Sequence, residues 1–282
     1  MNFGLGIILF LISWSVGCAQ MGESQRKDIN QAAFSEGIRQ YQVGNIQEAV
    51  NIFSNDLTHN PNQPEVWNAR GFAYARQGNW MKAIQDFQQA LSQDPENIQF
   101  QENLGVVHLE SGNLDKALDV FNRILGKTPD SYRVLNHRGL TLSRLERYSE
   151  AIQDFSRALS FNSEKADIFS NRAVAFMKMG EEELAQKDLD QAILLNPTLE
   201  QARESRGLLA LKRGNLELAI GDLTQAIALG ADSGLIHYNR AVALSMVGNM
   251  MEAQKEYHLA CDREMFQACR QKVEVSGYRD LL

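Results

Sequence analysis

The sequence predicts an all-α repeat protein, and three observations support this. First, a glycine or alanine recurs seven times at a constant spacing of 34 residues: Gly37, Gly71, Gly105, Gly139, Ala173, Gly207 and Ala241. We call the place of this residue in each copy the small-residue position. Second, alanine fills another position in every copy, from Ala49 to Ala253. Third, apolar residues return at steps of three and four, as in amphipathic helices. A period that never drifts indicates stacked structural units.

Each copy is expected to contain two helices joined by a tight turn. Six copies carry glycine at one turn position (Gly44, Gly78, Gly112, Gly180, Gly214 and Gly248), and only Glu146 departs from it. Glycine readily adopts the left-handed conformation that ends a helix, and a following asparagine, as in Gly78-Asn79, can cap the next helix. Proline ends the second helix in several copies (Pro61, Pro95, Pro129 and Pro197). No strand pattern competes with this interpretation.

The copies resemble the tetratricopeptide repeat over about residues 30 to 267. The second copy carries the motif most fully, with Trp67, Gly71, Tyr74, Ala83, Phe87, Ala90 and Pro95. The resemblance implies a right-handed α-solenoid of seven antiparallel helix hairpins followed by a C-terminal capping helix. The expected copies span residues 30–63, 64–97, 98–131, 132–165, 166–199, 200–233 and 234–263, with the capping helix and tail in residues 264–282.

Five copies carry an arginine just before the small-residue position and an acid 16 residues after that arginine: Arg70 and Asp86, Arg138 and Asp154, Arg172 and Asp188, Arg206 and Asp222, Arg240 and Glu256. The first and third copies lack both partners, with Glu36 and Leu104 at the arginine position and Ile52 and Val120 at the acid position. This joint loss favours ion pairs within a copy over pairs with the preceding copy. Five independent, solvent-facing charges are the alternative.

Residues 1–19 are expected to be an export signal, followed by a tether over residues 20–29. The apolar run in residues 3–16 is shorter than the roughly 20 residues that span a bilayer. Ser15-Val16-Gly17-Cys18 resembles a bacterial lipobox, which implies lipidation of Cys18. Ser15 departs from the usual leucine, and no Lys or Arg precedes the run. Ordinary cleavage after Ala19 and an uncleaved anchor remain alternatives. The sequence thus predicts an exported protein, anchored by lipid and facing the periplasm or cell surface.

Two further cysteines, Cys261 and Cys269, form an even pair in an exported chain. One continuous helix would hold them about 12 Å apart, beyond disulfide reach, so a bridge requires a turn near Asp262-Arg263. Cysteine pairs that staple hairpins in the related Sel1-like repeats are similar. Alternatively, Cys261 is a small buried side chain at a position where other copies carry leucine or isoleucine.

No pattern in the sequence indicates catalysis, a metal or a cofactor. The chain has no phosphate-binding glycine loop, no Cys-x-x-Cys and no histidine pair at a helical ligand spacing. The unbroken repeat phase leaves no room for an inserted catalytic domain. The net charge of −7, without a basic cluster, argues against a nucleic-acid partner. We therefore expect a non-enzymatic protein.

In the family, the first helix of each hairpin lines a concave groove that binds a peptide or protein. The residue after the small-residue position is apolar in every copy, and the residue three before it is mostly polar. The expected partner-binding residues are Asn68, Phe72, Asn136, Leu140, Asn171 and Val174. Packing between neighbouring hairpins is the alternative role of the apolar residues. The asparagine and lysine clamp by which relatives hold a carboxylate looks absent.

These expectations favour a protein-interaction scaffold or adaptor of the bacterial cell envelope. An assembly factor or chaperone for exported or outer-membrane proteins is the alternative. A third class, an enzyme accessory or hydrolase, would need a nucleophilic or acidic cluster that the repeats do not supply.

Overall fold

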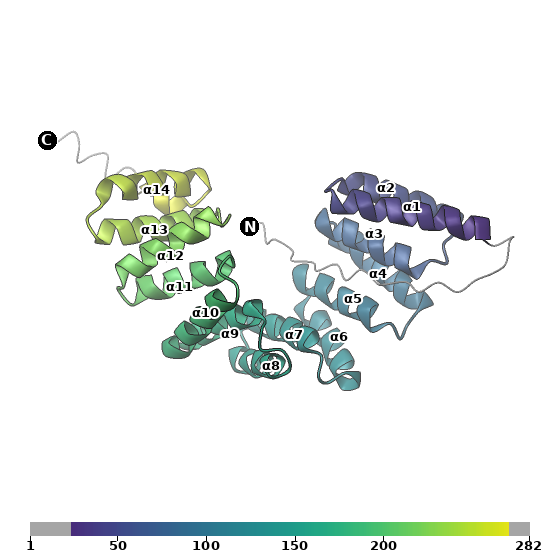
Figure 1. The fold of residues 1–282 in the computed structure, drawn as a ribbon, viewed down its shortest axis with the longest axis horizontal. Helices are drawn as coiled ribbons and strands as arrows, with labels where there is room; N and C mark the ends of the chain where they lie inside the picture. Colours follow the sequence, from purple (N-terminus) through teal and green to yellow (C-terminus); the bar gives the residue numbers. More distant parts are fainter. Residues whose placement is uncertain (1–23, 271–282) are drawn as a thin grey trace. The chain divides into compact units, whose positions relative to one another are not determined.

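The computed structural model describes residues 24–270, in which consecutive helices form antiparallel hairpins (Figure 1). The chain divides between Pro129 and Asp130 into two compact units, which are described separately. No strand occurs within residues 24–270. The predicted all-α fold of helix hairpins is thus confirmed. The predicted signal over residues 1–19, the lipidated Cys18 and the tail from residue 271 lie outside the described residues.

The N-terminal unit contains three hairpins. They pair α1 (Ser24–Gln42) with α2 (Ile46–His59), α3 (Pro64–Arg76) with α4 (Trp80–Gln93), and α5 (Ile98–Glu110) with α6 (Leu114–Lys127). Each hairpin packs on the next through its second helix, α2 against α3 and α4 against α5. Helix α1 begins at Ser24, inside the segment expected to be a tether, because the repeat phase marks only where the motif starts and not where helical residues start.

The C-terminal unit contains four hairpins. They pair α7 (Tyr132–Arg144) with α8 (Tyr148–Phe161), α9 (Ala166–Met179) with α10 (Glu182–Leu195), α11 (Glu200–Lys212) with α12 (Leu216–Ala228), and α13 (Gly234–Met246) with α14 (Met250–Asp262). After a turn at residues 263–265 the chain is helical again from residue 266 to the end of the described range, where a capping helix was expected.

Each hairpin is held by a close approach at the small-residue position. A Cβ atom added at Gly139 would lie 2.6 Å from the ring of Phe155, and one added at Gly71 would lie 2.9 Å from the ring of Phe87. Both phenylalanines are fully buried. Where the second helix instead carries Leu189, the first helix carries Ala173. In these three hairpins the side-chain volumes complement each other, as expected in a densely packed core. The last two hairpins depart from this match, since Gly207 faces Leu223 and Ala241 packs in one cluster with Tyr257.

The turn glycines have the positive φ that the sequence predicted, from 72° at Gly78 to 88° at Gly44. Glu146, the one exception in sequence, adopts the same conformation with φ of 60°. A side chain in this region costs energy, because its Cβ crowds the backbone carbonyl. The fourth hairpin thus carries local strain that the other six avoid.

The following asparagine caps the second helix in only some copies. The side chains of Asn79, Asn215 and Asn249 accept a hydrogen bond from the backbone amide three residues later. In contrast, Asn45 and Asn113 donate their side-chain amides to Gln40 and Ser111. The Gly-Asn pattern thus predicts the turn more reliably than the cap.

Replacing Glu146 with glycine should relieve this strain. We expect Glu146→Gly to raise the free energy of unfolding by about 0.5–1 kcal/mol, measured by urea denaturation. As the matched control, Gly180→Ala at the same turn position should lower it by about 1 kcal/mol. A Glu146→Gly variant no more stable than the natural protein would contradict this account of the turn.

Candidate partner-binding face

The first helices of neighbouring hairpins form one side of each unit. Helix α1 packs against α3 in the N-terminal unit, and α7 against α9, α9 against α11, and α11 against α13 in the C-terminal unit. We call this side the first-helix face. All six residues predicted to bind a partner belong to first helices, two of them in the N-terminal unit and four in the C-terminal unit.

In the N-terminal unit, Asn68 and Phe72 lie one turn apart on α3. The Nδ2 atom of Asn103 on α5 donates a hydrogen bond to Oδ1 of Asn68, at 2.8 Å. The ring of Phe72 packs edge-on against that of Phe87, with centroids 5.3 Å apart. Both predicted residues therefore contribute to packing between helices, and each remains only partly accessible.

In the C-terminal unit, Asn136 and Leu140 lie on α7, and Asn171 and Val174 lie on α9. The Nδ2 atom of Asn171 donates a hydrogen bond to Oδ1 of Asn136, at 3.1 Å. Asn136 is only 8% exposed, whereas Val174 is 40% exposed. Among the predicted residues of this unit, Val174 is therefore the most open to a ligand, and Asn136 mainly joins two hairpins.

The sequence prediction missed Asn103, although a signal for it exists. Asn68 and Asn103 are 35 residues apart, as are Asn136 and Asn171. The donor asparagine lies 35 residues after the acceptor, one more than the 34-residue period, and the bond joins two neighbouring hairpins. Comparing only equivalent positions of each copy could not reveal this bond.

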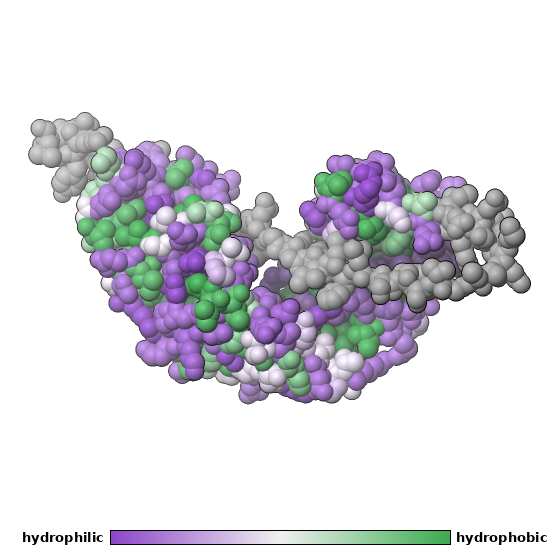
Figure 2. Space-filling model, viewed as in Figure 1, coloured by the Kyte–Doolittle hydropathy of each residue, from purple (hydrophilic) through white to green (hydrophobic). Residues whose placement is uncertain are grey.

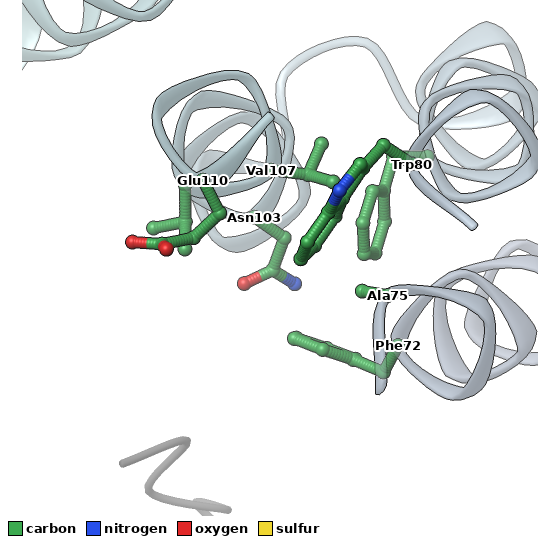
Figure 3. Close-up of a pocket in the computed structure, with 8 residues that line it drawn as sticks. Phe72, Ala75, Trp80, Asn103, Val107 and Glu110 are labelled. Carbon is green, nitrogen blue, oxygen red and sulfur yellow. The ribbon is translucent and has the colours of Figure 1, made fainter. Parts of the chain in front are cut away.

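The N-terminal unit has a small cavity beside this face. Figure 3 shows Phe72 and Ala75 on one side, Asn103, Val107 and Glu110 on another, and the Trp80 ring between them. Its volume of about 10 Å³ has room for at most one water molecule. A larger ligand would therefore have to lie across the surface instead of entering the helix packing.

All five predicted ion pairs form within their hairpins, with N···O distances from 2.6 to 2.9 Å. Four are bidentate, joining Nε and Nη2 of the arginine to both oxygens of an aspartate. In the seventh copy, Nη1 of Arg240 contacts Glu256. The acids are buried, so these pairs hold the two helices of a hairpin in register.

Several of these arginines also reach the preceding hairpin. Nη1 of Arg70 donates to Ser54, Nη1 of Arg172 to Ser156, and Nη1 of Arg206 to Asp190, at 3.1, 3.0 and 2.6 Å. These three partners each stand two residues after the acid position of the preceding copy, so they are not the between-copy ion pairs weighed against pairing within a copy. One guanidinium has enough donors to reach three helices.

A wider hollow lies between α9 and α10 in the C-terminal unit. It has a volume of about 490 Å³ and is lined by residues including Phe169, Arg172, Phe176 and Lys187. The Arg172 guanidinium lies over both rings, 5.6 Å from that of Phe169 and 5.8 Å from that of Phe176. Its donors already bind Asp188 and Ser156. Three of the five N–H groups of this guanidinium are therefore already used within the protein, and its charge is paired with Asp188.

The last hairpin is closed by a disulfide and a charged network. Cys261 and Cys269 are bridged, with Cα atoms 4.9 Å apart across a turn in which Glu264 has φ of 65°. Nearby, the buried His237 ring contacts Glu256 through Nδ1 at 2.6 Å and Asp232 through Nε2 at 2.9 Å. Hydrogen bonds from Arg263 and His237 lower the pKa of Asp232. The network therefore ties the start of α13 to the end of α14.

Apolar surface on the displayed face of the C-terminal unit forms small separate patches among polar residues (Figure 2). Within residues 24–270, no three His, Cys, Asp or Glu side chains gather in a way that could hold a metal ion. No helix in this part of the chain has the length and apolar character needed to cross a membrane.

A model of the tetratricopeptide repeat family matches residues 34–97, 69–132, 103–171, 170–234 and 204–253. No curated protein sequence matches the chain. Among solved structures, a tetratricopeptide repeat protein from Parabacteroides merdae is 21% identical, covers 83% of this chain and 93% of its own, and has a TM-score of 0.67.

Two other solved structures have a similar fold. PilF of Pseudomonas aeruginosa is 19% identical, with a TM-score of 0.62, and the match covers 74% of this chain and 95% of PilF. A chain in the complex of Cut9 and Hcn1 from the APC/C is 22% identical, with a TM-score of 0.67. The match covers 76% of this chain but only 42% of the length of the matched chain. At these identities the similarity concerns the fold alone.

The interhelical ion pairs should be energetically coupled. For Arg172→Ala and Asp188→Ala, we expect a double-mutant cycle to give a coupling of about 1.5–3 kcal/mol in the free energy of unfolding, because the side chains are only 19% and 6% exposed. The surface pair Arg147 and Glu150, exposed by 45% and 52%, should give about 0–1 kcal/mol. Equal coupling in the two pairs would contradict the structural role assigned to the buried one.

Proposed function

Because the chain belongs to the tetratricopeptide repeat family, we propose that it is a non-enzymatic scaffold that binds an extended peptide or protein segment along its first-helix face. The observation that carries this proposal is the composition of that face. It combines a solvent-exposed apolar side chain, Val174, with half-buried amides such as Asn171, and the cavity beside it in the N-terminal unit is too small for a ligand.

An extended segment suits this arrangement chemically. Apolar side chains of the ligand would cover Val174 and Leu140. Asn171 uses one amide hydrogen on Asn136 and retains a second donor and its carbonyl oxygen for a peptide backbone. Extended surfaces of this kind are what stacked repeats offer to partners.

A role as an assembly factor for exported proteins is the second candidate. Two solved structures of similar fold support it: PilF, and PilW, which is described as a type IV pilus biogenesis factor and is 20% identical with a TM-score of 0.63. A scaffold would have one stoichiometric partner, whereas an assembly factor would bind many unfolded clients. No feature of the described residues suggests a nucleic-acid partner.

We further propose that the protein is exported and anchored by a lipid on Cys18. The lipobox-like Ser15-Val16-Gly17-Cys18 supports this, as does the pairing of Cys261 with Cys269, since disulfides persist in oxidising compartments.

A photo-crosslinking amino acid placed at two exposed apolar positions should distinguish the two sides of a hairpin. At Val174 on the first helix α9, we expect crosslinks to a partner in intact cells. At Leu194 on the second helix α10, which is even more exposed at 74%, we expect none. Crosslinks from position 194 alone would place the partner on the other side of the repeats and contradict the proposal.

Lipidation is tested by intact-mass measurement of the mature protein. The natural chain should begin at Cys18 and carry acyl groups, and Cys18→Ala should abolish both the acyl mass and membrane association. A natural protein that begins at Met1 or Gln20 would rule out the lipid anchor.

A further inference from the structure

We propose that Glu204 holds a lysine or arginine side chain of the bound segment on the first-helix face of the C-terminal unit. This inference rests on the proposed function and names the chemistry of its ligand. It starts from an acid that has no hydrogen-bonding or ion-pair partner among residues 24–270.

Glu204 lies on α11 at the repeat position of Asn68 and Asn136. In those two copies the side chain accepts a hydrogen bond from an asparagine 35 residues later, on the next first helix. The residue 35 positions after Glu204 is Asn239 on α13, which packs against α11. Repeat geometry thus places Glu204 where α11 and α13 meet on the first-helix face.

Glu204 and Asn239 are not joined by the hydrogen bond that links Asn68 to Asn103 and Asn136 to Asn171. Glu204 and Asn239 are both half-buried, yet neither side chain has a hydrogen bond or ion pair within the described residues. A partly buried carboxylate without a donor is destabilised relative to one in water. The Glu204 oxygens are not among the fully enclosed side-chain atoms that lack a partner, so a ligand can reach them and supply the donors.

The four buried acids of this unit are all neutralised. Asp154, Asp188, Asp222 and Glu256 are each bound by an arginine of their own hairpin. Glu204 has no such cation, and its burial together with the neighbouring charge of Glu200 raises its pKa. The half-buried Glu204 therefore differs from these acids in having no paired cation among the described residues, a place that a basic side chain of a ligand can take.

A cationic side chain fits better than a metal ion. No metal-binding cluster exists among the described residues, so Glu204 would be a single ligand. Val174 and Leu208 on the same face provide apolar surface for the methylene groups of lysine or arginine. The Asn239 amide can bond the peptide backbone beside that side chain. The net charge of −7 also favours a basic segment.

The test uses the full chain and a random peptide library. Selected peptides should share a lysine or arginine at one position. A synthetic selected peptide should bind Glu204→Gln at least about tenfold more weakly than the natural protein, and its norleucine variant should bind both proteins equally. Glu217→Gln, which removes an exposed charge from the second helix α12, serves as the matched control and should leave the affinity unchanged.

Stability provides an independent readout. The raised pKa means that folding favours the protonated acid, so ionised Glu204 costs stability once the pH exceeds that pKa. Glu204→Gln should therefore raise the thermal midpoint at pH 7 and change it less near pH 4. A merely structural glutamate would give a lower midpoint on substitution, which would count against a ligand-binding role.

The possible failures are distinguishable. If selected peptides lose binding on Val174→Asp but show no basic residue and bind Glu204→Gln normally, the inference about Glu204 is wrong and the proposed function stands. If no peptide depends on the first-helix face, both are wrong.

Discussion

The contact between a small residue on the first helix and a large buried side chain on the second determines the geometry of every hairpin. Where phenylalanine fills the second-helix position, as at Phe87 and Phe155, only glycine leaves room for it; the smaller Leu189 is matched by Ala173. This close approach allows the arginine beside the small residue to reach an acid on the second helix. The guanidinium then ties the hairpin to its predecessor through Ser54, Ser156 or Asp190.

These interactions divide the polar groups of each unit into two kinds. The arginine and acid pairs satisfy one another and leave few donors for a ligand, even in the hollow beside Arg172. On the first-helix face, the asparagine bonds use only part of each amide, and Glu204 has no partner at all within the described residues. The first-helix face therefore retains unused polar capacity, which is what recognition of a peptide backbone and a basic side chain requires.

Much of the fold could be predicted from the sequence, because the 34-residue period locates each helix, turn and ion pair relative to the others. The period could not predict where α1 begins, since Ser24 precedes the first motif residue, nor that Glu146 would adopt a glycine conformation. It also could not show that Asn136 is bonded to Asn171, because that bond links residues one place out of phase. All six residues of the candidate site do lie on first helices, while their accessibility depends on three-dimensional packing that the period does not encode.

The central claim is that partners bind on the first-helix face of the repeats. Backbone amide hydrogen exchange, compared for the full chain alone and with a saturating bound segment, tests it most directly. The account predicts slower exchange in α9, α11 and α13, with α10 and α12 nearly unchanged. Protection confined to the second helices α10 and α12 would contradict it.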